Sequence, residues 1–239
     1  MKISIAMTTC NGAKYLQKQL DSFLAQSRQP DQIVVCDDCS SDTTVEILMR
    51  FKEIAPFDVD IFKNESNLGV SRNFEKAISI CSGDIIFISD QDDFWNSKKI
   101  EYVMEFFNDH QDIQVVINDA IIADEKLVPS KVSVLKQIHS FSGSTNEFIH
   151  GCCTALRKTF SDLSLPLPRV GEEVVGYDGW IHNVGVYLDV RAVLPIALQH
   201  YRRHQTNVSN SSSNSQKKVN LRDKFLFLMA DSSSKRNTL

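Results

Sequence analysis

The first hundred residues alternate between short apolar runs and amphipathic segments, and this order constrains the fold more than any other feature of the sequence. Runs with the length and composition of strands occupy residues 3–7, 32–36, 58–62 and 85–89. Segments with helical spacing of apolar residues separate these runs and begin near Asn11, Asp42 and Ser71, with Asn11 as the expected N-cap of the first helix. The order predicts an α/β fold with a parallel sheet, right-handed crossovers and helices on both faces.

The second half of the chain has a less regular pattern. We expect an amphipathic helix after residue 96, a helix over 177–187, a strand near 113–118 and a short apolar piece at 148–156. Two strands near 190–194 and 197–201 are expected to pair with each other, whereas no regular pattern is evident at 121–148. The polar, serine-rich stretch 209–216 predicts a linker, and 217–239 a basic amphipathic tail.

Composition narrows the class of protein. The 239 residues suit one large domain or two small ones, and the net charge of −4 gives no electrostatic argument for a nucleic-acid partner. No apolar stretch approaches the roughly 18 residues of a membrane-spanning helix, and the N-terminus does not resemble a signal peptide. We therefore expect a cytoplasmic protein with reduced thiols, in which Cys36 and Cys39 are small filler residues rather than half of a zinc site or a redox motif.

Polar side chains follow three of the predicted parallel strands. These are Thr8–Asn11 after the first strand, Asp37 and Asp38 after the second, and Asp90–Asp93 after the fourth. Turn propensity alone would explain any one of them. Because ligands of parallel α/β sheets bind outside the carboxyl ends of the strands, the coincidence of all three favours one shared site.

The stretch 90–93 places three aspartates within four positions. Carboxylates this close raise one another's pKa unless a cation lies among them, so the stretch is either a solvated turn or a metal site. Its D-x-D pattern offers hard oxygen ligands of the kind that Mg²⁺ and Mn²⁺ prefer. The sequence contains no glycine-rich phosphate loop, so a cation bridging to a diphosphate would have to neutralise the phosphate charge.

Seven segments, in order, give the chain a resemblance to family 2 glycosyltransferases with the GT-A fold, and within them to the bacterial rhamnosyltransferase-like branch. They lie between residues 8 and 209 and read TTCNGAKYLQKQLDSFLAQS, IVVCDDCSSDTT, NLGVSRNFEKAI, SGDIIFISDQDDFW, FIHGCCTALRK, YDGW and YRRHQTNVS. The resemblance implies a Rossmann-like three-layer α/β/α domain over 1–208, with a mostly parallel central sheet. Its nucleotide-sugar half would be 1–95 and its acceptor half 96–208.

The resemblance also implies which residues bind the nucleotide. Thr8 and Asn11 would line its pocket. Asp37 would hydrogen-bond the pyrimidine or the ribose, with Asp38 beside it. Arg72 would reach the base or the diphosphate.

Further roles are implied at the reacting end of the donor. Asp90 and Asp92 form the D-x-D, with Asp92 as the direct ligand of Mg²⁺ or Mn²⁺ and Asp93 in support. Asp178 occupies the position of the catalytic base, and His204 that of a further metal or diphosphate contact. On the sequence alone, Asp178 could instead be a helix cap. Arg72 and His204 could instead be solvated surface residues.

These roles describe an inverting, metal-dependent transferase. The donor would be dTDP-rhamnose or a UDP-sugar, and the acceptor a hydroxyl of a bacterial surface polysaccharide, as a free or lipid-linked glycan. The segment 217–230 would allow contact with the inner face of the plasma membrane. Two alternatives remain: a catalytically silent nucleotide-sugar binding module, and a receiver-type signalling domain, which also has acidic residues after parallel strands.

Overall fold

The computed structural model describes residues 1–142, 150–171 and 173–207. The chain divides into two compact units, Met1–Arg202 and Arg203–Leu239. The predicted linker 209–216 and the tail 217–239 lie outside the described residues.

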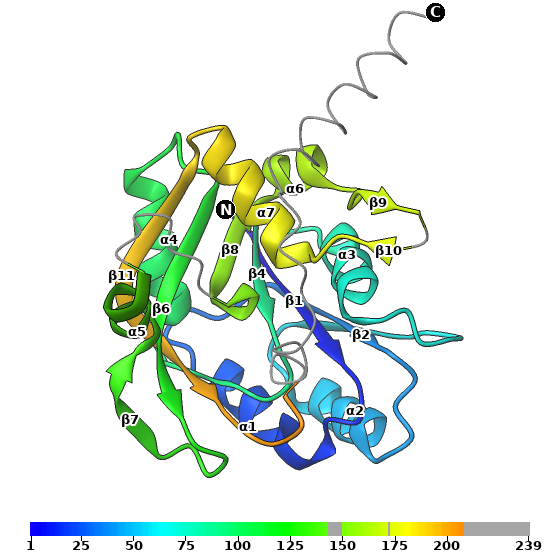
Figure 1. The fold of residues 1–239 in the computed structure, drawn as a ribbon. Coiled ribbons are helices and arrows are strands. Elements are labelled where there is room, and N and C mark those ends of the chain that lie inside the picture. The colour runs from blue at the N-terminus through cyan, green and yellow to red at the C-terminus, as the bar shows by residue number, and fades with distance from the viewer. Residues whose placement is uncertain (143–149, 172, 208–239) are drawn as a thin grey trace, which may run out of the picture. The chain divides into compact units, whose positions relative to one another are not determined.

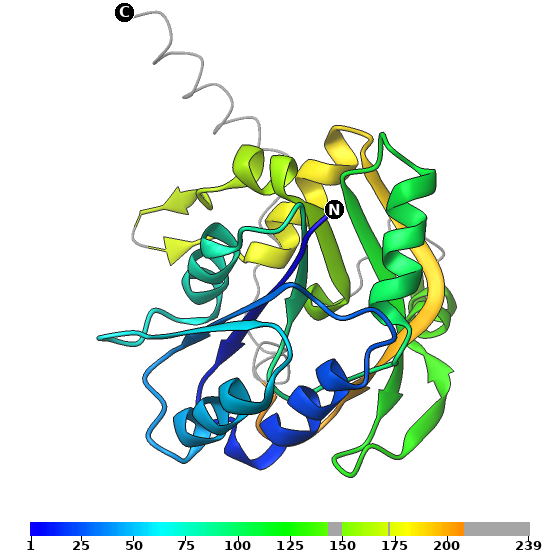
Figure 2. The same ribbon diagram turned by 180° about the vertical axis from the view of Figure 1, so that it is seen from behind.

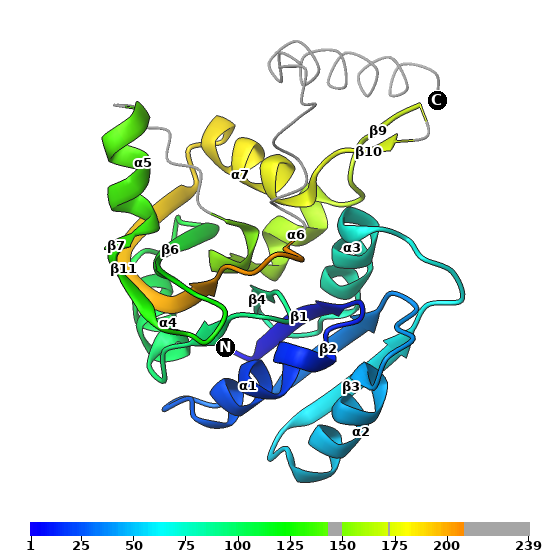
Figure 3. The ribbon, with the colours of Figure 1, turned by 60° about the horizontal axis from the view of Figure 1, so that its bottom comes forward.

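The first half of the chain forms the parallel part of the sheet, as predicted (Figure 1). Its strands are β1 (Ile3–Thr9), β2 (Gln32–Asp37), β3 (Asp58–Lys63) and β4 (Ile85–Ser89). The helices between them are α1 (Ala13–Leu24), α2 (Thr44–Ile54) and α3 (Val70–Ile80). The spatial order is β3-β2-β1-β4 with parallel pairing throughout, so the carboxyl ends of these strands share one edge, which faces the viewer more directly in Figure 3.

The second half extends the same sheet. β8 (Thr154–Arg157) lies antiparallel between β4 and β6 (Val115–Ala123), and β11 (Arg191–Arg202) runs parallel to β6. Two short strands, β5 (Phe94–Trp95) and β7 (Pro129–Ser133), pair antiparallel with β11 and β6. The remaining elements are α4 (Lys99–Asp109), α5 (Val134–Ser142), the 3-10 turn η1 (Gly151–Cys153), α6 (Lys158–Ser164), α7 (Tyr177–Tyr187) and the hairpin β9 (Arg169–Val170) and β10 (Glu173–Val174). The expected α/β fold is confirmed.

Helices cover both faces of this sheet. Alternate residues of β1 (Ile3, Ile5 and Met7) point into the main apolar core, to which α1, α2 and α4 contribute their buried faces. Figure 2 shows these three helices in front of the sheet. The other face is covered by α3, α6 and α7, which pack against one another. Within the described residues, no helix has the length and apolarity needed to cross a membrane.

Two local predictions are wrong. The expected strands at 190–194 and 197–201 do not pair with each other. Residues 191–194 and 197–201 are parts of the single strand β11, which pairs with β6 and has irregular register between Leu194 and Ala197. Pro195, which lacks an N–H group, lies at this irregularity and made the strand look interrupted. The N-cap of α1 is Gly12 rather than Asn11. Asn11 has a φ of 48°, and its side-chain oxygen accepts hydrogen bonds from Ser41.

Candidate functional site

The acidic turn Asp90–Asp93 connects β4 to β5 at the carboxyl edge of the sheet. Asp93 is fully buried. Its Oδ2 accepts a hydrogen bond from Gln199 Nε2 at 3.0 Å, and its Oδ1 accepts one from the backbone N–H of Arg202 at 3.1 Å. Asp93 is thus held by β11, and the turn is not simply solvated.

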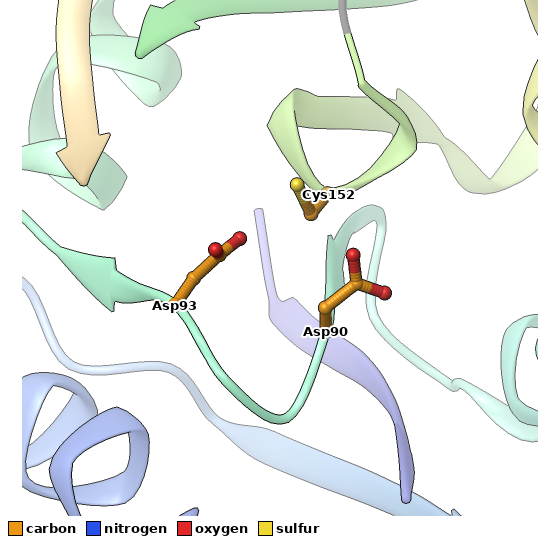
Figure 4. Close-up of side chains that lie close together, drawn as sticks. All are labelled: Asp90, Asp93 and Cys152. Atoms are coloured by element: carbon orange, nitrogen blue, oxygen red, sulfur yellow. The ribbon is translucent and has the colours of Figure 1, made fainter. Parts of the chain in front are cut away.

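Asp90 and Asp93 project from the two ends of this turn on the side where Cys152 of η1 lies (Figure 4). One ligand atom from each of the three lies within 4.8 Å of the others, the arrangement of a metal site among the described residues. Burial, followed by the charges of Asp92 and Asp93, holds the pKa of Asp90 well above its usual range. Burial and the Asp92 charge raise the pKa of Asp93 to about 7. These carboxylates therefore repel one another unless positive charge compensates them.

The donor set fits a hard divalent cation only in part. Asp90 and Asp93 supply the oxygen ligands that Mg²⁺ and Mn²⁺ prefer. The hydrogen bond with Cys153, together with burial, raises the pKa of the Cys152 thiol well above its usual value. A thiol sulfur is also a softer donor than Mg²⁺ and Mn²⁺ prefer. Asp92 does not belong to this group of three, although its charge acts on both neighbours. Its predicted role as the direct ligand stays a prediction.

Asp178 lies in the first turn of α7, close enough to Asp90 for its charge to raise the pKa of Asp90. Its own pKa is raised by burial. The start of α7 is held in place by α3, because the Tyr177 N–H donates to Ser71 Oγ at 3.3 Å and the Tyr177 ring stacks on Phe74 at 4.1 Å. Asp178 therefore sits at a fixed position beside the acidic turn.

The loops after β1 and β2 are tied together by Asp37 and Asp38. Asp37 is fully buried and accepts hydrogen bonds from the Thr9 and Ser40 hydroxyl groups at 2.7 and 2.6 Å. Asp38 accepts the backbone N–H groups of Leu68 and Gly69 at 2.7 and 2.9 Å. Both carboxylates thus organise the loops at the sheet edge, and contact with a nucleotide stays a prediction.

The other predicted residues are placed as follows. Thr8 is partly buried and Asn11 exposed at the end of β1, on the same edge as the acidic turn. Arg72, in the first turn of α3, lines a groove of about 580 Å³ between α3 and α6. His204 belongs to the second unit, where its ring nitrogens contact Thr206 and Asn207.

Several site residues were missed from the sequence. Gln91 lies within the acidic turn, and its side-chain amide both accepts from the N–H of Cys10 at 2.9 Å and donates to its carbonyl at 3.1 Å, which joins this turn to the loop after β1. The guanidinium of Arg202 lies 4.8 Å from the Tyr15 ring centre, and the charges of Asp92 and Asp93 act on it. Arg202 belongs to the motif YRRHQTNVS, and this motif was the sequence signal that could have identified it. Lys99 and Gln199, which contact each other beside this turn, had weaker signals in the sequence.

Comparison with known proteins gives a consistent result. The sequence profile described as glycosyl transferase family 2 matches residues 4–163. A glycosyltransferase of Nostoc sp. described as uncharacterized is 27% identical over 220 residues, which cover 87% of this chain and 66% of that protein. A dTDP-rhamnosyl transferase of Shigella flexneri is 24% identical over 222 residues, or 84% of this chain and 72% of that protein.

Two solved structures resemble the fold. Staphylococcus aureus TarS 1–349 in complex with UDP-GlcNAc has a TM-score of 0.70 at 20% identity, over 90% of this chain and 62% of that one. The mannosyltransferase PcManGT of Pyrobaculum calidifontis in complex with GDP-Man and Mn²⁺ has a TM-score of 0.68 at 16% identity, over 88% of this chain and 59% of that one. At these identities the likeness concerns the fold. The match to the Nostoc relative likewise leaves about a third of that protein uncovered.

Proposed function

This chain belongs to glycosyl transferase family 2, and from that membership we propose that it transfers a sugar from a nucleotide-diphosphate donor to a hydroxyl group of an acceptor. The observation that carries the proposal is the acidic turn after β4, where Asp90 and Asp93 lie close together and the charge of Asp178 acts on Asp90. The family membership sets aside the receiver-type alternative, but not a catalytically silent binding module.

Asp178 is the proposed general base. The acceptor hydroxyl must lose its proton as it attacks the anomeric carbon, and a carboxylate with a raised pKa binds that proton more readily. One base and no covalent intermediate give inversion at the anomeric carbon. The anchored start of α7 supports this role, because a base must be held within hydrogen-bonding reach of the acceptor.

Asp90, Asp92 and Asp93 are the proposed ligands of Mg²⁺ or Mn²⁺. Such a cation supplies Lewis-acid stabilisation of the diphosphate leaving group when it is bound. The raised pKa values of Asp90 and Asp93 support a site for positive charge at this turn. Arg72 and His204 are proposed as further contacts to the base, the diphosphate or the metal, and Thr8, Asn11, Asp37 and Asp38 as the edge that receives the nucleotide.

The proposed donor is dTDP-rhamnose or a UDP-sugar. The first is supported by the similarity to a dTDP-rhamnosyl transferase, and the second by the fold shared with a protein solved with UDP-GlcNAc. The proposed acceptor is a bacterial surface polysaccharide precursor, free or lipid-linked, and the proposed location is the cytoplasm, with contact at the inner face of the plasma membrane.

A donor panel tests the proposal. Thermal unfolding is recorded with dTDP-rhamnose, UDP-GlcNAc or GDP-mannose in the presence of Mn²⁺, Mg²⁺ or EDTA. A donor at a hundredfold excess over its dissociation constant should stabilise the fold by about 2.7 kcal/mol, and only with the cation. Release of nucleoside diphosphate is then followed with glycan acceptors, because a silent binding module would bind the donor without turning it over.

Two variants make the panel specific. Asp92→Ala should abolish cation-dependent donor binding, whereas Asp109→Ala removes an exposed carboxylate at the end of α4 and serves as the matched control. Equal donor binding by Asp92→Ala and wild type would remove Asp92 from the metal site. The absence of stabilisation by any nucleotide sugar, with or without a cation, would refute the proposed function.

A further inference from the structure

Lys99 is the first residue of α4 and is fully buried, whereas its neighbour Lys98 is exposed. The Lys99 ammonium group donates hydrogen bonds to the side-chain oxygen of Gln199 and, at 3.2 Å, to the carbonyl of Cys152. It also lies 3.9 Å from the centre of the Trp95 ring, within the range of a cation–π interaction. These three partners, all within the described part of the chain, include no carboxylate, although a buried ammonium group is costly unless it is compensated.

Gln199 connects this ammonium group to the acidic turn. Its oxygen accepts from Lys99, and its nitrogen donates to Asp93 Oδ2 at 3.0 Å. Gln199 is itself buried, so its amide has one orientation in which both partners are satisfied. Lys99 and Asp93 therefore lie on the two sides of one side-chain amide.

The charges on the two sides are complementary. Lys99 carries a positive charge and Asp93 an acidic side chain, and the buried Gln199 amide hydrogen-bonds to both groups. Burial lowers the pKa of Lys99 to about 8, so it stays mostly protonated at neutral pH. A methionine would fill the same space without the cost of burying a charge. A lysine at this position is therefore explained better by its charge than by packing.

We propose that Lys99 is a built-in counter-cation of the acidic turn, which acts on Asp93 across Gln199 and compensates part of the carboxylate charge before a divalent cation binds. Lys99 is then a positioning residue. Its effect on metal binding rests on the proposed function, whereas its effect on the metal-free fold does not. Because Lys99 and a divalent cation neutralise the same carboxylates, each reduces the electrostatic stabilisation that the other provides.

The first test is a double-mutant cycle in EDTA. Urea midpoints are measured for wild type, Lys99→Met, Asp93→Asn and the double variant. Lys99→Met should lower the midpoint, because it leaves Asp93 buried without its counter-charge. Adding Asp93→Asn should restore much of the loss, since the Gln199 amide can then reverse and pair with the new amide. Lys98→Met, in the neighbouring exposed pair with Glu101, is the matched control and should change little.

A double variant no more stable than Lys99→Met would overturn the proposal. If Lys99→Met does not fold, a folded double variant supports the proposal. Failure of both to fold would show that Lys99 is needed independently of Asp93, and would overturn it.

The second test measures Mn²⁺ binding without donor, from the free Mn²⁺ signal in electron paramagnetic resonance. Lys99→Met should bind Mn²⁺ about tenfold more tightly than wild type, because it removes a nearby positive charge, whereas Lys98→Met should not. Unchanged or weaker binding by Lys99→Met would contradict the competition between the two cations. If wild type binds no Mn²⁺, the metal in the proposed function is wrong, and the metal-free cycle alone decides the role of Lys99.

Discussion

Replacing Gly151 by alanine tests whether the proposed base depends on a close contact between η1 and α7. A Cβ atom at position 151 would lie 2.3 Å from the Tyr177 hydroxyl oxygen and 2.9 Å from Cβ of Asp178. Neither neighbour can give way easily. Tyr177 is buried and stacked on Phe74, and Cβ of Asp178 is fixed by the backbone of α7.

The expected cost follows from this geometry. Overpacking of a buried contact typically costs about 1–3 kcal/mol, and for a domain of this size each kcal/mol lowers the melting temperature by about 2–4 °C. The clash would be relieved by moving the start of α7, which carries Asp178. A misplacement of about 1 Å can reduce turnover by about 10²-fold, so kcat should fall much more than donor affinity.

Gly179→Ala is the matched control. It makes the same change next to Asp178, but an added Cβ would meet nothing within 4 Å. It should stabilise the protein by about 0.5–1 kcal/mol, because alanine favours the helix over glycine. Urea unfolding and nucleoside diphosphate release are measured for both variants. If Gly151→Ala is as stable and as active as wild type, the start of α7 adapts freely and the reasoning is wrong.

Four further predictions follow from the same site. Asp178→Asn should keep donor affinity but lose about 10²–10⁴-fold in kcat, and near-normal turnover would exclude Asp178 as the base. Asp38→Asn should lower the free energy of unfolding by about 1–3 kcal/mol. The Leu68 and Gly69 N–H groups donate to different oxygens of the Asp38 carboxylate, and an asparagine amide has only one oxygen. Asp124→Asn is the control for Asp38→Asn, because one oxygen of Asp124 accepts both backbone N–H groups that it binds, and an asparagine can keep that oxygen. Equal losses of stability in the two variants would contradict the argument. Without metal, Asp93 binds its proton more tightly in the folded protein, with a pKa of about 7 against 3.8, so the stability that it contributes falls as the pH rises through this window. Between pH 4 and pH 7, the urea midpoint of Asp93→Asn should therefore rise relative to that of wild type. A difference that does not change with pH would refute the raised pKa of Asp93. Finally, wild type should co-sediment with anionic vesicles, less so at high salt, and deletion of 217–239 should abolish this; equal sedimentation of the truncated protein would exclude the tail as the anchor.

The parallel half of the fold could be predicted because its signals are local. Each strand of β1 to β4 is a continuous apolar or alternating run, and each intervening helix shows its buried face at three- and four-residue spacing. The pairing of β8 could not be predicted, because four residues, TALR, carry little periodicity of their own. Their place between β4 and β6 is decided by contacts with segments far away in the chain.

The site was predictable to the level of its acidic residues but not of their partners. Charged residues at strand ends are visible in a sequence, whereas the hydrogen-bonding partners of Asp93 come from β11, more than a hundred positions away. Lys99 was not identified from the sequence, where it follows another lysine. It lies four positions before Val103, on the buried face of α4, and that spacing was the available signal.

The position of β8 also has a consequence for synthesis on the ribosome. β4 can pair with β1 once both have emerged, but in the folded protein its other edge pairs with β8, which leaves the ribosome about sixty residues later. At about 5–20 residues per second, this delay lasts several seconds. During that interval the nascent chain presents a largely apolar strand with an open edge, the kind of surface that pairs with other chains. A chaperone that binds extended apolar segments would therefore be expected to act on nascent chains that end between β4 and β8.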